Sequence, residues 1–156
     1  MKKVKEFMNK KVIHLFPEDT IFDAAKKLSK SNIAGAPVVE KNKIVGIISI
    51  SDIIKFIDIK LGKLPRIDGP GLSTLLFALI QMQKVHSDFK KELKKITSTE
   101  IRDVMTKNVI TVTPSATLIE VAELMEKHDV NRLPVVKEGN LLGIVARADL
   151  IKALVD

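Results

Sequence analysis

One short stretch of the chain places a hydroxyl and a carboxylate where a helix is expected to begin. In the sequence GIISISDII, Ser49 ends an apolar, strand-like run and Asp52 follows three residues later. This spacing before an apolar run is typical of a capping box, in which the two residues bond to the free amides of the first helical turn. Those free amides and the positive end of the helix dipole also attract anions. Spacing alone favours capping and leaves anion binding open.

The stretch occurs twice. It returns 97 residues later as GIVARADLI, with Ala146 and Asp149 at the two positions. An alanine side chain cannot cap a helix, yet the aspartate is present, so we expect that capping does not account for both aspartates. Residues 4–55 and 101–152 align at this offset without a gap. The chain is therefore read as a duplicated unit.

Each unit is predicted to contain a strand, a helix, two strands and a closing helix. In the first unit these are a strand near 12–15, a helix capped by Asp19 or Thr20 that ends near Ser31, strands 37–39 and 44–48 around a tight turn at Lys41–Asn42, and a helix over 53–59. A unit of this size buries little apolar surface alone. We therefore expect an α+β (α/β) fold in which two β-α-β-β-α units pack sheet against sheet around a pseudo-two-fold axis and share one core.

Residues 61–100 separate the two units, which we place at 1–60 and 101–156. A turn-rich loop is followed by apolar residues spaced alternately three and four apart: Leu72, Leu75, Leu79, Met82, His86, Phe89, Leu93 and Ile96. This heptad seam predicts an inserted long helix. The helix either pairs with its copy in a second chain, giving a homodimer, or packs on its own module, and both interpretations remain open.

The composition argues against several classes of protein. There is no cysteine, which removes disulfides, thiolate metal sites and thiol catalysis. His14, His86 and His128 stand in no recognisable acid–base or nucleophile motif, so we expect neither an enzyme nor a metal site. The longest apolar run, 75–80, is far shorter than the about 20 residues of a spanning helix, and we see no signal peptide. We expect a cytoplasmic protein without a membrane partner.

The net charge of +7 comes mainly from lysines that are spread along the chain. A basic balance is compatible with nucleic-acid binding, but the sequence has no tyrosine or tryptophan to stack on bases. The charge therefore favours a solvated surface. A nucleic-acid-binding module and a purely structural dimerisation module remain the alternatives.

Several segments of both units resemble the CBS domain family, named after cystathionine β-synthase. They are Glu6–Lys10 with Asp103–Lys107, Ala36–Val39 with Leu133–Val136, and the two glycine-to-aspartate stretches described above. CBS domains occur in pairs and regulate other proteins by binding adenosine-containing ligands. The resemblance implies a tandem CBS pair that needs no cofactor and senses AMP, ADP or ATP, or alternatively S-adenosylmethionine or methylthioadenosine, on behalf of an unknown regulated protein.

The resemblance also implies two ligand clefts, each built from the glycine-to-aspartate stretch of one unit and residues of the other. Cleft A is expected to contain Ile47, Ser49, Asp52, Thr113, Leu118, Val130, Asn131 and Arg132. Cleft B is expected to contain Phe16, Ile21, Ile33, Ala34, Gly35, Ala146 and Asp149. In both, the aspartate is expected to bind the ribose hydroxyls. Ile47, Leu118 and Val130 are expected to enclose adenine, and the strand glycines Gly46 and Gly143 to leave room for close approach to the backbone.

The two clefts differ in their cations. Arg132 resembles the phosphate-binding arginine of nucleotide-sensing family members, and arginine binds phosphate through paired, charge-assisted hydrogen bonds. Cleft B has Ala34 and Gly35 at the corresponding place. We therefore predict a nucleotide in cleft A, and either nothing or an uncharged adenosyl group in cleft B. Arg147 is either a surface residue or a source of charge for cleft B.

Overall fold

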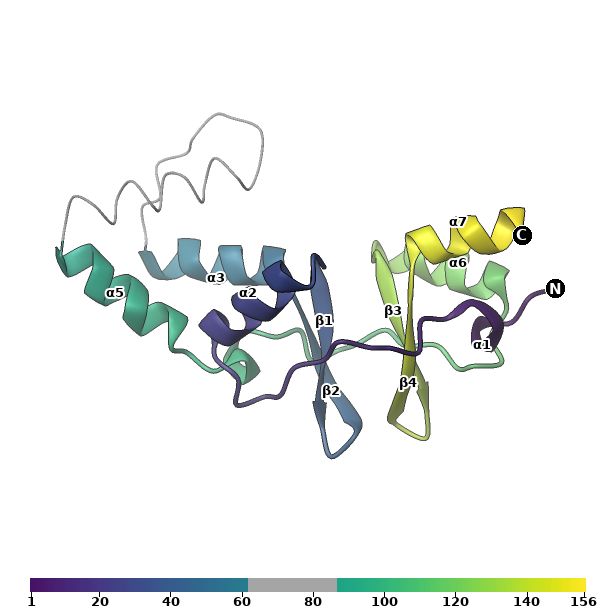
Figure 1. Ribbon diagram of the computed structural model, residues 1–156, viewed down its shortest axis with the longest axis horizontal. Helices are drawn as coiled ribbons and strands as arrows, with labels where there is room; N and C mark the ends of the chain where they lie inside the picture. The colour runs from purple at the N-terminus through teal and green to yellow at the C-terminus, as the bar shows by residue number, and fades with distance from the viewer. Residues whose placement is uncertain (62–86) are drawn as a thin grey trace.

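The computed structural model describes residues 1–61 and 87–156. Its elements are α1 (Val4–Phe7), α2 (Ile21–Lys30), β1 (Gly35–Glu40), β2 (Lys43–Ser49), α3 (Ile50–Leu61), α5 (Ser87–Thr97), the 3-10 turn η1 (Ile101–Asp103), α6 (Leu118–His128), β3 (Arg132–Lys137), β4 (Asn140–Ala146) and α7 (Arg147–Val155). Figure 1 shows two halves side by side, with both chain ends beside the second half. No helix of these two ranges is long and apolar enough to span a membrane.

Each half contains one antiparallel hairpin, and the two hairpins share the same register. Gly35 pairs with Ser49 in the first and Arg132 with Ala146 in the second. The sheet order is β1-β2-β4-β3, which reads the same from either end, as expected for two related units. The central strands meet through one pair, Lys43 with Asn140, beside the hairpin turns.

The predicted tight turns are confirmed. Lys41 and Asn42 have φ angles of 49° and 64°, and their counterparts Glu138 and Gly139 have 53° and 80°. Two consecutive residues with positive φ match the twist of the flanking strands, which is why asparagine and glycine serve here.

The helices that follow the first loop of each half begin with the same capping arrangement. Thr20 caps α2: its Oγ1 accepts from the amide of Asp23 at 3.1 Å, and its own amide donates to the Asp23 carboxylate at 3.0 Å. Thr117 and Glu120 repeat this at α6, with distances of 3.3 and 2.6 Å. Because these bonds stabilise the charged form, they lower the pKa of both carboxyl groups. The predicted cap at Thr20 is confirmed.

The expected first strand of each unit is reduced to one residue. Leu15 forms a single parallel bridge with Val38, and Val112 forms the equivalent bridge with Val135. The prediction of a strand at 12–15 is wrong. The next backbone hydrogen bonds on either side of the bridge would need donors at positions 17 and 37, and both positions are proline, which has no amide hydrogen. The prolines at 114 and 134 end the second bridge in the same way.

The expectation of one shared core is also wrong, because each half has its own. The first core contains Leu15, Ile21, Ala24, Leu28, Ala36, Val38, Ile48, Ile53 and Ile101. The second contains Val4, Val112, Val121, Met125, Leu133, Val135, Val145 and Leu150. Ile101 and Val4 are the exceptions to sequence order, since each lies in the core of the other unit.

These two residues belong to lead segments, residues 3–9 and 100–106, that cross between the halves. Asn9 bridges to Ile144, and Thr106 bridges to Ile47. In Figure 1 the purple α1 accordingly lies beside the yellow α7. Each unit completes the other, so the exchanged segments join the two halves in addition to the short pairing of β2 with β4.

The strand glycines serve this exchange. A Cβ atom at Gly46 would lie 2.4 Å from the sulfur of Met105, and one at Gly143 would lie 2.8 Å from the sulfur of Met8. The close approach predicted for these glycines exists, but the neighbour is the lead segment of the other unit. Their assignment to ligand approach is therefore corrected.

The central insertion is described only from α5 onward. The seam residues from Leu72 to His86 lie outside the described residues, and with them the prediction of one long helix. Within α5, Leu93 is half-buried and Ile96 is buried, and the helix contacts α2 of the first half. Pairing with a second chain stays a prediction.

Candidate functional site

A cleft of about 360 Å³ lies between the halves, at the strand ends opposite the hairpin turns. We call it the central cleft. Its lining residues are Ala34, Ile47, Ser49, Ser51 and Asp52 from the first unit, and Thr106, Asn108, Val109, Ile110, Asp129, Val130, Asn131 and Arg132 from the second. It therefore combines the start of α3 with the start of β3 and with the chain that follows the second lead segment.

Asp52 sits in the first turn of α3, where it completes a capping box. Its Oδ2 accepts from the Ser49 amide at 2.9 Å, and its amide donates to the Ser49 hydroxyl at 3.2 Å. No residue of the described ranges donates to its second oxygen, Oδ1. The half-buried carboxylate thus uses one oxygen for the helix and keeps the other for a further donor.

Asp149 makes the corresponding bond in the second half. Its Oδ2 accepts from the amide of Ala146 at 2.8 Å, although alanine offers no side-chain acceptor in return. The argument that capping does not account for both aspartates is therefore wrong. A carboxylate at this position caps the backbone amide whatever the N-cap side chain is. Retention of the aspartate is not in itself a sign of a ligand.

Arg132 begins β3, and its half-buried side chain lines the central cleft. Loss of solvent around the guanidinium lowers its pKa from the ordinary value for arginine. The group still carries its charge at neutral pH. In the part of the chain that the structure describes, ion pairs are made by Arg102 with Glu18 and Glu100, and no carboxylate lies within 4.0 Å of Arg132. The cleft therefore contains a partly desolvated cation without a close counter-charge.

Asn131 is held by Arg147, the first residue of α7 in the same half. Its Oδ1 accepts from Nε of Arg147 at 3.0 Å, and its backbone oxygen accepts from the Arg147 amide at 3.1 Å. Because arginine only donates, the oxygen of the Asn131 amide must face Arg147, which leaves the NH2 group free to donate elsewhere. Arg147 is exposed, as one of the two interpretations expected, and it orients a residue of the central cleft.

The structure brings most of the cleft A residues together. Ile47, Ser49, Asp52, Val130, Asn131 and Arg132 all line the central cleft. Thr113 and Leu118 do not: Thr113 lines a separate surface pocket, and Leu118 packs against the second core.

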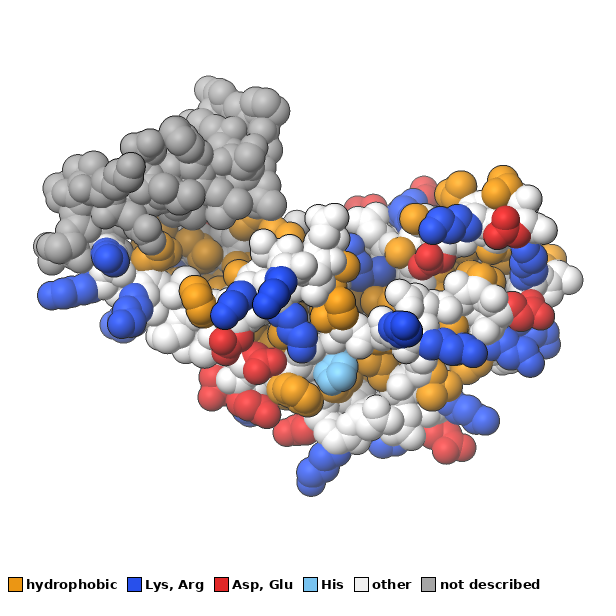
Figure 2. All heavy atoms as spheres, viewed as in Figure 1, with side chains coloured by type: hydrophobic (Ala, Val, Ile, Leu, Met, Phe, Trp, Pro, Cys, Tyr) orange, Lys and Arg blue, Asp and Glu red, His pale blue; other side chains and the backbone are white. Residues whose placement is uncertain are grey.

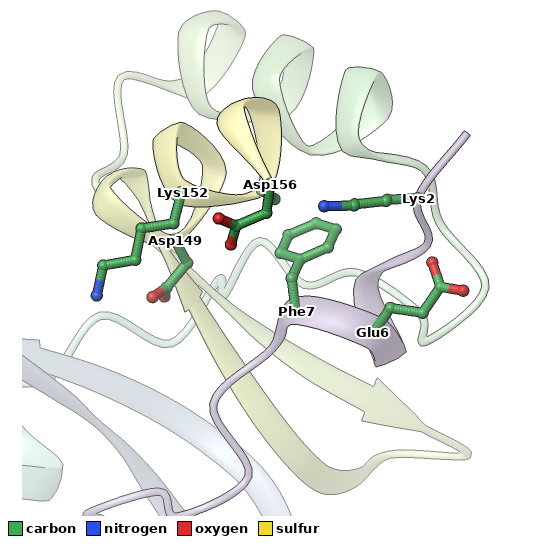
Figure 3. Close-up of a pocket in the computed structure, with 7 residues that line it drawn as sticks. Lys2, Glu6, Phe7, Asp149, Lys152 and Asp156 are labelled. Atoms are coloured by element: carbon green, nitrogen blue, oxygen red, sulfur yellow. The ribbon is translucent and has the colours of Figure 1, made fainter.

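The cleft B residues are not gathered around one cavity. Ala34 lines the central cleft, Ile21 is fully buried in the first core, and Ile33 packs against that core. Phe16 is 43% exposed and lies edge-on against His14. Asp149 lines a different pocket, of about 450 Å³, between α1 and α7. Figure 3 shows Asp149 on α7 on the same side as Lys152, while Asp156 lies nearer to Phe7 of α1.

The sequence reasoning missed the stretch from Thr106 to Ile110. Thr106 exchanges two backbone hydrogen bonds of 2.9 Å with Ile47, and this pairing places Asn108, Val109 and Ile110 on the wall of the central cleft. The signal was available, because Thr106 belongs to the second CBS-like lead motif. Its use required knowing that the lead segments cross to the other half.

Charge and metal chemistry give no second site among the described residues. On the face that Figure 2 shows, basic and acidic side chains are interspersed over both halves. Within residues 1–61 and 87–156, no group of three or more histidine, aspartate or glutamate side chains is placed to hold a metal ion. The central cleft is thus the strongest candidate for function.

Comparison with known proteins gives related chains of similar length. The protein MJ1426 of Methanocaldococcus jannaschii is 40% identical over 154 residues, which are 97% of this chain and 90% of that one. The chain spans less than half of two longer proteins of the same organism, at 29% identity.

Solved structures give the same fold. The CBS pair of protein MJ0100 in complex with 5′-methylthioadenosine and S-adenosyl-L-methionine has a TM-score of 0.68 and 28% identity, over 99% of this chain and 96% of that one. CBSX2 in complex with AMP has a TM-score of 0.70 and 24% identity, over 99% and 97%. The model of the CBS domain matches residues 4–59 and 101–156. The chain therefore belongs to the CBS domain family, as a tandem pair.

Proposed function

We propose that this CBS pair binds an adenosine nucleotide (AMP, ADP or ATP) in the central cleft and acts as a regulatory energy or metabolite sensor. The observation that carries the proposal is the uncompensated guanidinium of Arg132 in the same cleft as the Asp52 carboxylate. A phosphate would supply the missing counter-charge, and a ribose would supply donors to the free carboxylate oxygen.

The ribose, adenine and phosphate of a nucleotide each have suitable residues in the central cleft. Asp52 Oδ1 is available to the ribose hydroxyls, since Oδ2 is occupied by the helix cap. Ile47, Val109, Ile110 and Val130 offer apolar surface to the adenine ring. The phosphate would lie toward Arg132 and the first turn of α3.

That first turn has one amide to spare. The amide of Ile50 donates to the Ala34 oxygen and that of Asp52 to the Ser49 hydroxyl, so the amide of Ser51 is left for a ligand. Ser51 lines the cleft. A free amide at a helix N-terminus next to an arginine favours a phosphate over an uncharged group.

Binding in this position would couple to the arrangement of the two units. The cleft is lined by both, and they are joined by exchanged segments and a single strand pair. A ligand that binds one relative angle more tightly than another shifts the population toward it, and only that difference in affinity can drive the shift. A regulated partner protein would read the angle, so the proposed role is regulatory and not catalytic.

Related structures support the ligand class. The MJ0100 pair was solved with two adenosyl compounds that carry no phosphate. The chemistry of Arg132 is the reason for preferring a phosphorylated ligand here, with S-adenosylmethionine or methylthioadenosine as the alternative.

A thermal-shift panel tests the proposal. The purified chain is heated with adenosine, AMP, ADP, ATP, methylthioadenosine or S-adenosylmethionine at equal concentrations. A ligand that binds the folded form raises the Tm, by a stabilisation that is about 2.7 kcal/mol at 100 times its Kd. We expect AMP, ADP or ATP to raise the Tm more than adenosine does. No shift with any of the six compounds would contradict the proposal. A larger Tm shift with methylthioadenosine than with AMP would show that the preferred ligand is an adenosyl compound without phosphate.

The homodimer is part of the same proposal. Light scattering during size-exclusion chromatography gives the mass in solution directly. A mass of twice 17.3 kDa is expected, and a mass of 17.3 kDa at all concentrations would contradict the dimer without affecting nucleotide binding.

A further inference from the structure

Gly35 and Arg132 are counterparts in the two units, and they touch. Gly35 is the first residue of β1 and Arg132 the first of β3, each at the same place in its hairpin. The contact between the two halves at this point therefore joins a bare backbone to the guanidinium that lines the central cleft.

The space above Gly35 is filled by Arg132. A Cβ atom at Gly35 would lie 2.5 Å from Nη1 and 3.4 Å from Cζ of Arg132, and 3.1 Å from the backbone oxygen of Ile48. Real Cβ atoms essentially never approach another heavy atom within 3.0 Å. Any residue other than glycine would move the guanidinium from its position.

Backbone conformation does not require this glycine. Among the described residues, the glycine with a positive φ is Gly139 in the hairpin turn. Gly35 is buried in a regular strand, where alanine is accommodated by the same dihedral angles. Position 35 has no space for a Cβ atom, and the atom that would lie nearest to it belongs to Arg132.

The guanidinium has little else to fix it. In the described ranges it makes no ion pair, so its place at the cleft is set by packing against Gly35. The group ends a flexible side chain, which can rotate away without disturbing the strand. A side chain at position 35 would therefore displace the cation, and its Cβ would also lie tightly against the backbone oxygen of Ile48.

We propose that Gly35 is a positioning residue for phosphate binding, because it provides the space in which Arg132 faces the central cleft. The same contact permits only one member of the pair to carry a side chain of any size. It follows that positions 35 and 132 together supply one phosphate-binding cation and not two. This inference rests on the proposed nucleotide binding.

Titration calorimetry of the Gly35→Ala variant with AMP and with adenosine tests the inference. Loss of one charge-assisted hydrogen bond corresponds to roughly tenfold or more in affinity. We expect AMP to bind about tenfold more weakly, and adenosine to bind within about twofold of the original chain. In an Arg132→Gln background, Gly35→Ala should change AMP affinity by less than about twofold, because the displaced group is already absent.

Gly143→Ala is the matched control. It also adds a Cβ to a buried strand glycine, 2.8 Å from the sulfur of Met8, but it does not touch Arg132. It should lower stability and leave the ratio of AMP to adenosine affinity unchanged. This separates positioning of Arg132 from a general loosening of the module.

The outcomes are distinct. If the original chain binds AMP, two results would overturn the role of Gly35 and leave nucleotide binding intact. One is an equal loss of AMP and adenosine affinity in Gly35→Ala. The other is that the losses of AMP affinity caused by Gly35→Ala and Arg132→Gln add up in the double variant. Failure of the original chain to bind AMP at all would overturn the proposed function and this inference with it.

Discussion

The two halves of this CBS pair share one backbone plan and differ where they face each other. Both begin their last helix with an aspartate that accepts from the N-cap amide, at 2.9 Å in the first half and 2.8 Å in the second. The facing positions are unlike: Arg132 opposes Gly35 across the module, and Asn131 corresponds to Ala34. The aspartates therefore cap both helices, and the two halves differ in the residues that face them.

This comparison changes how strongly each residue indicates a ligand site. Asp52 and Asp149 are explained by capping alone, so neither identifies a site by itself. Arg132 has no such structural explanation in the described residues, since it forms no ion pair and is partly desolvated. Partial desolvation of an unpaired charge carries a cost, which makes Arg132 more informative about a ligand than the two aspartates.

The largest expected effect concerns the exchange of lead segments. Ile101 is fully buried in the first core although it belongs to the second unit. Ile101→Ala should lower the free energy of unfolding by about 2–5 kcal/mol. Val4→Ala, its counterpart in the second core, should cost about 2 kcal/mol because fewer buried carbons are removed. Urea denaturation measures both.

Ile119→Ala is the control for these variants, because Ile119 is 49% exposed and should change stability by less than about 0.5 kcal/mol. Hydrogen exchange should show that Ile101→Ala loosens β1 and β2 more than β3. A cost for Ile101→Ala no larger than that of the control would mean that the exchanged segments do not hold the halves.

The next effect concerns the cation that distinguishes the halves. Arg132→Gln removes the charge from the central cleft and should weaken AMP binding by about 10- to 100-fold, while adenosine binding changes little. Calorimetry with both ligands measures this ratio. Equal losses for AMP and adenosine would show that Arg132 does not contact the phosphate.

The smallest effect concerns the caps of α2 and α6. The backbone amides and hydroxyls of Thr20 and Thr117 lower the pKa of Asp23 and Glu120 from the ordinary 3.8 and 4.5. A carboxyl whose pKa is lower in the folded state stabilises the fold above its unfolded value, and this contribution is lost as pH falls through the folded value. Both groups are exposed, so the change is small.

Urea denaturation between pH 7 and pH 2 checks this. The advantage of the original chain over Asp23→Asn and over Glu120→Gln should be constant above about pH 5 and should shrink below it, first for Glu120. An advantage that does not change with pH would mean that the cap bonds are not charge-assisted.

Local features of the fold were predictable from local residues. The turn at Lys41–Asn42 and the cap at Thr20 follow from residue types whose backbone preferences act within a few positions. The strand predicted at 12–15 is a single bridge at Leu15. The sequence already contains the reason, because Pro17 and Pro37 cannot donate the backbone hydrogen bonds that a longer strand needs.

Long-range features were less accessible. That Met8 packs on Gly143 and Met105 on Gly46 requires the lead segments to cross, and no short-range pattern encodes a crossing. For the same reason Asn108, Val109 and Ile110 were missed and Thr113 and Leu118 were placed in the cleft instead. Six of the eight residues expected in cleft A line the central cleft, because the CBS resemblance already carried the long-range information.

The central claim is that one aspartate of the pair binds ribose and the other only caps a helix. Calorimetry with AMP on Asp52→Asn and Asp149→Asn tests it most directly, because asparagine keeps an oxygen for the cap amide in both variants. We expect one AMP per chain, at least about tenfold weaker binding in Asp52→Asn, and unchanged binding in Asp149→Asn. Equal effects of the two substitutions, or two AMP molecules per chain, would contradict the account.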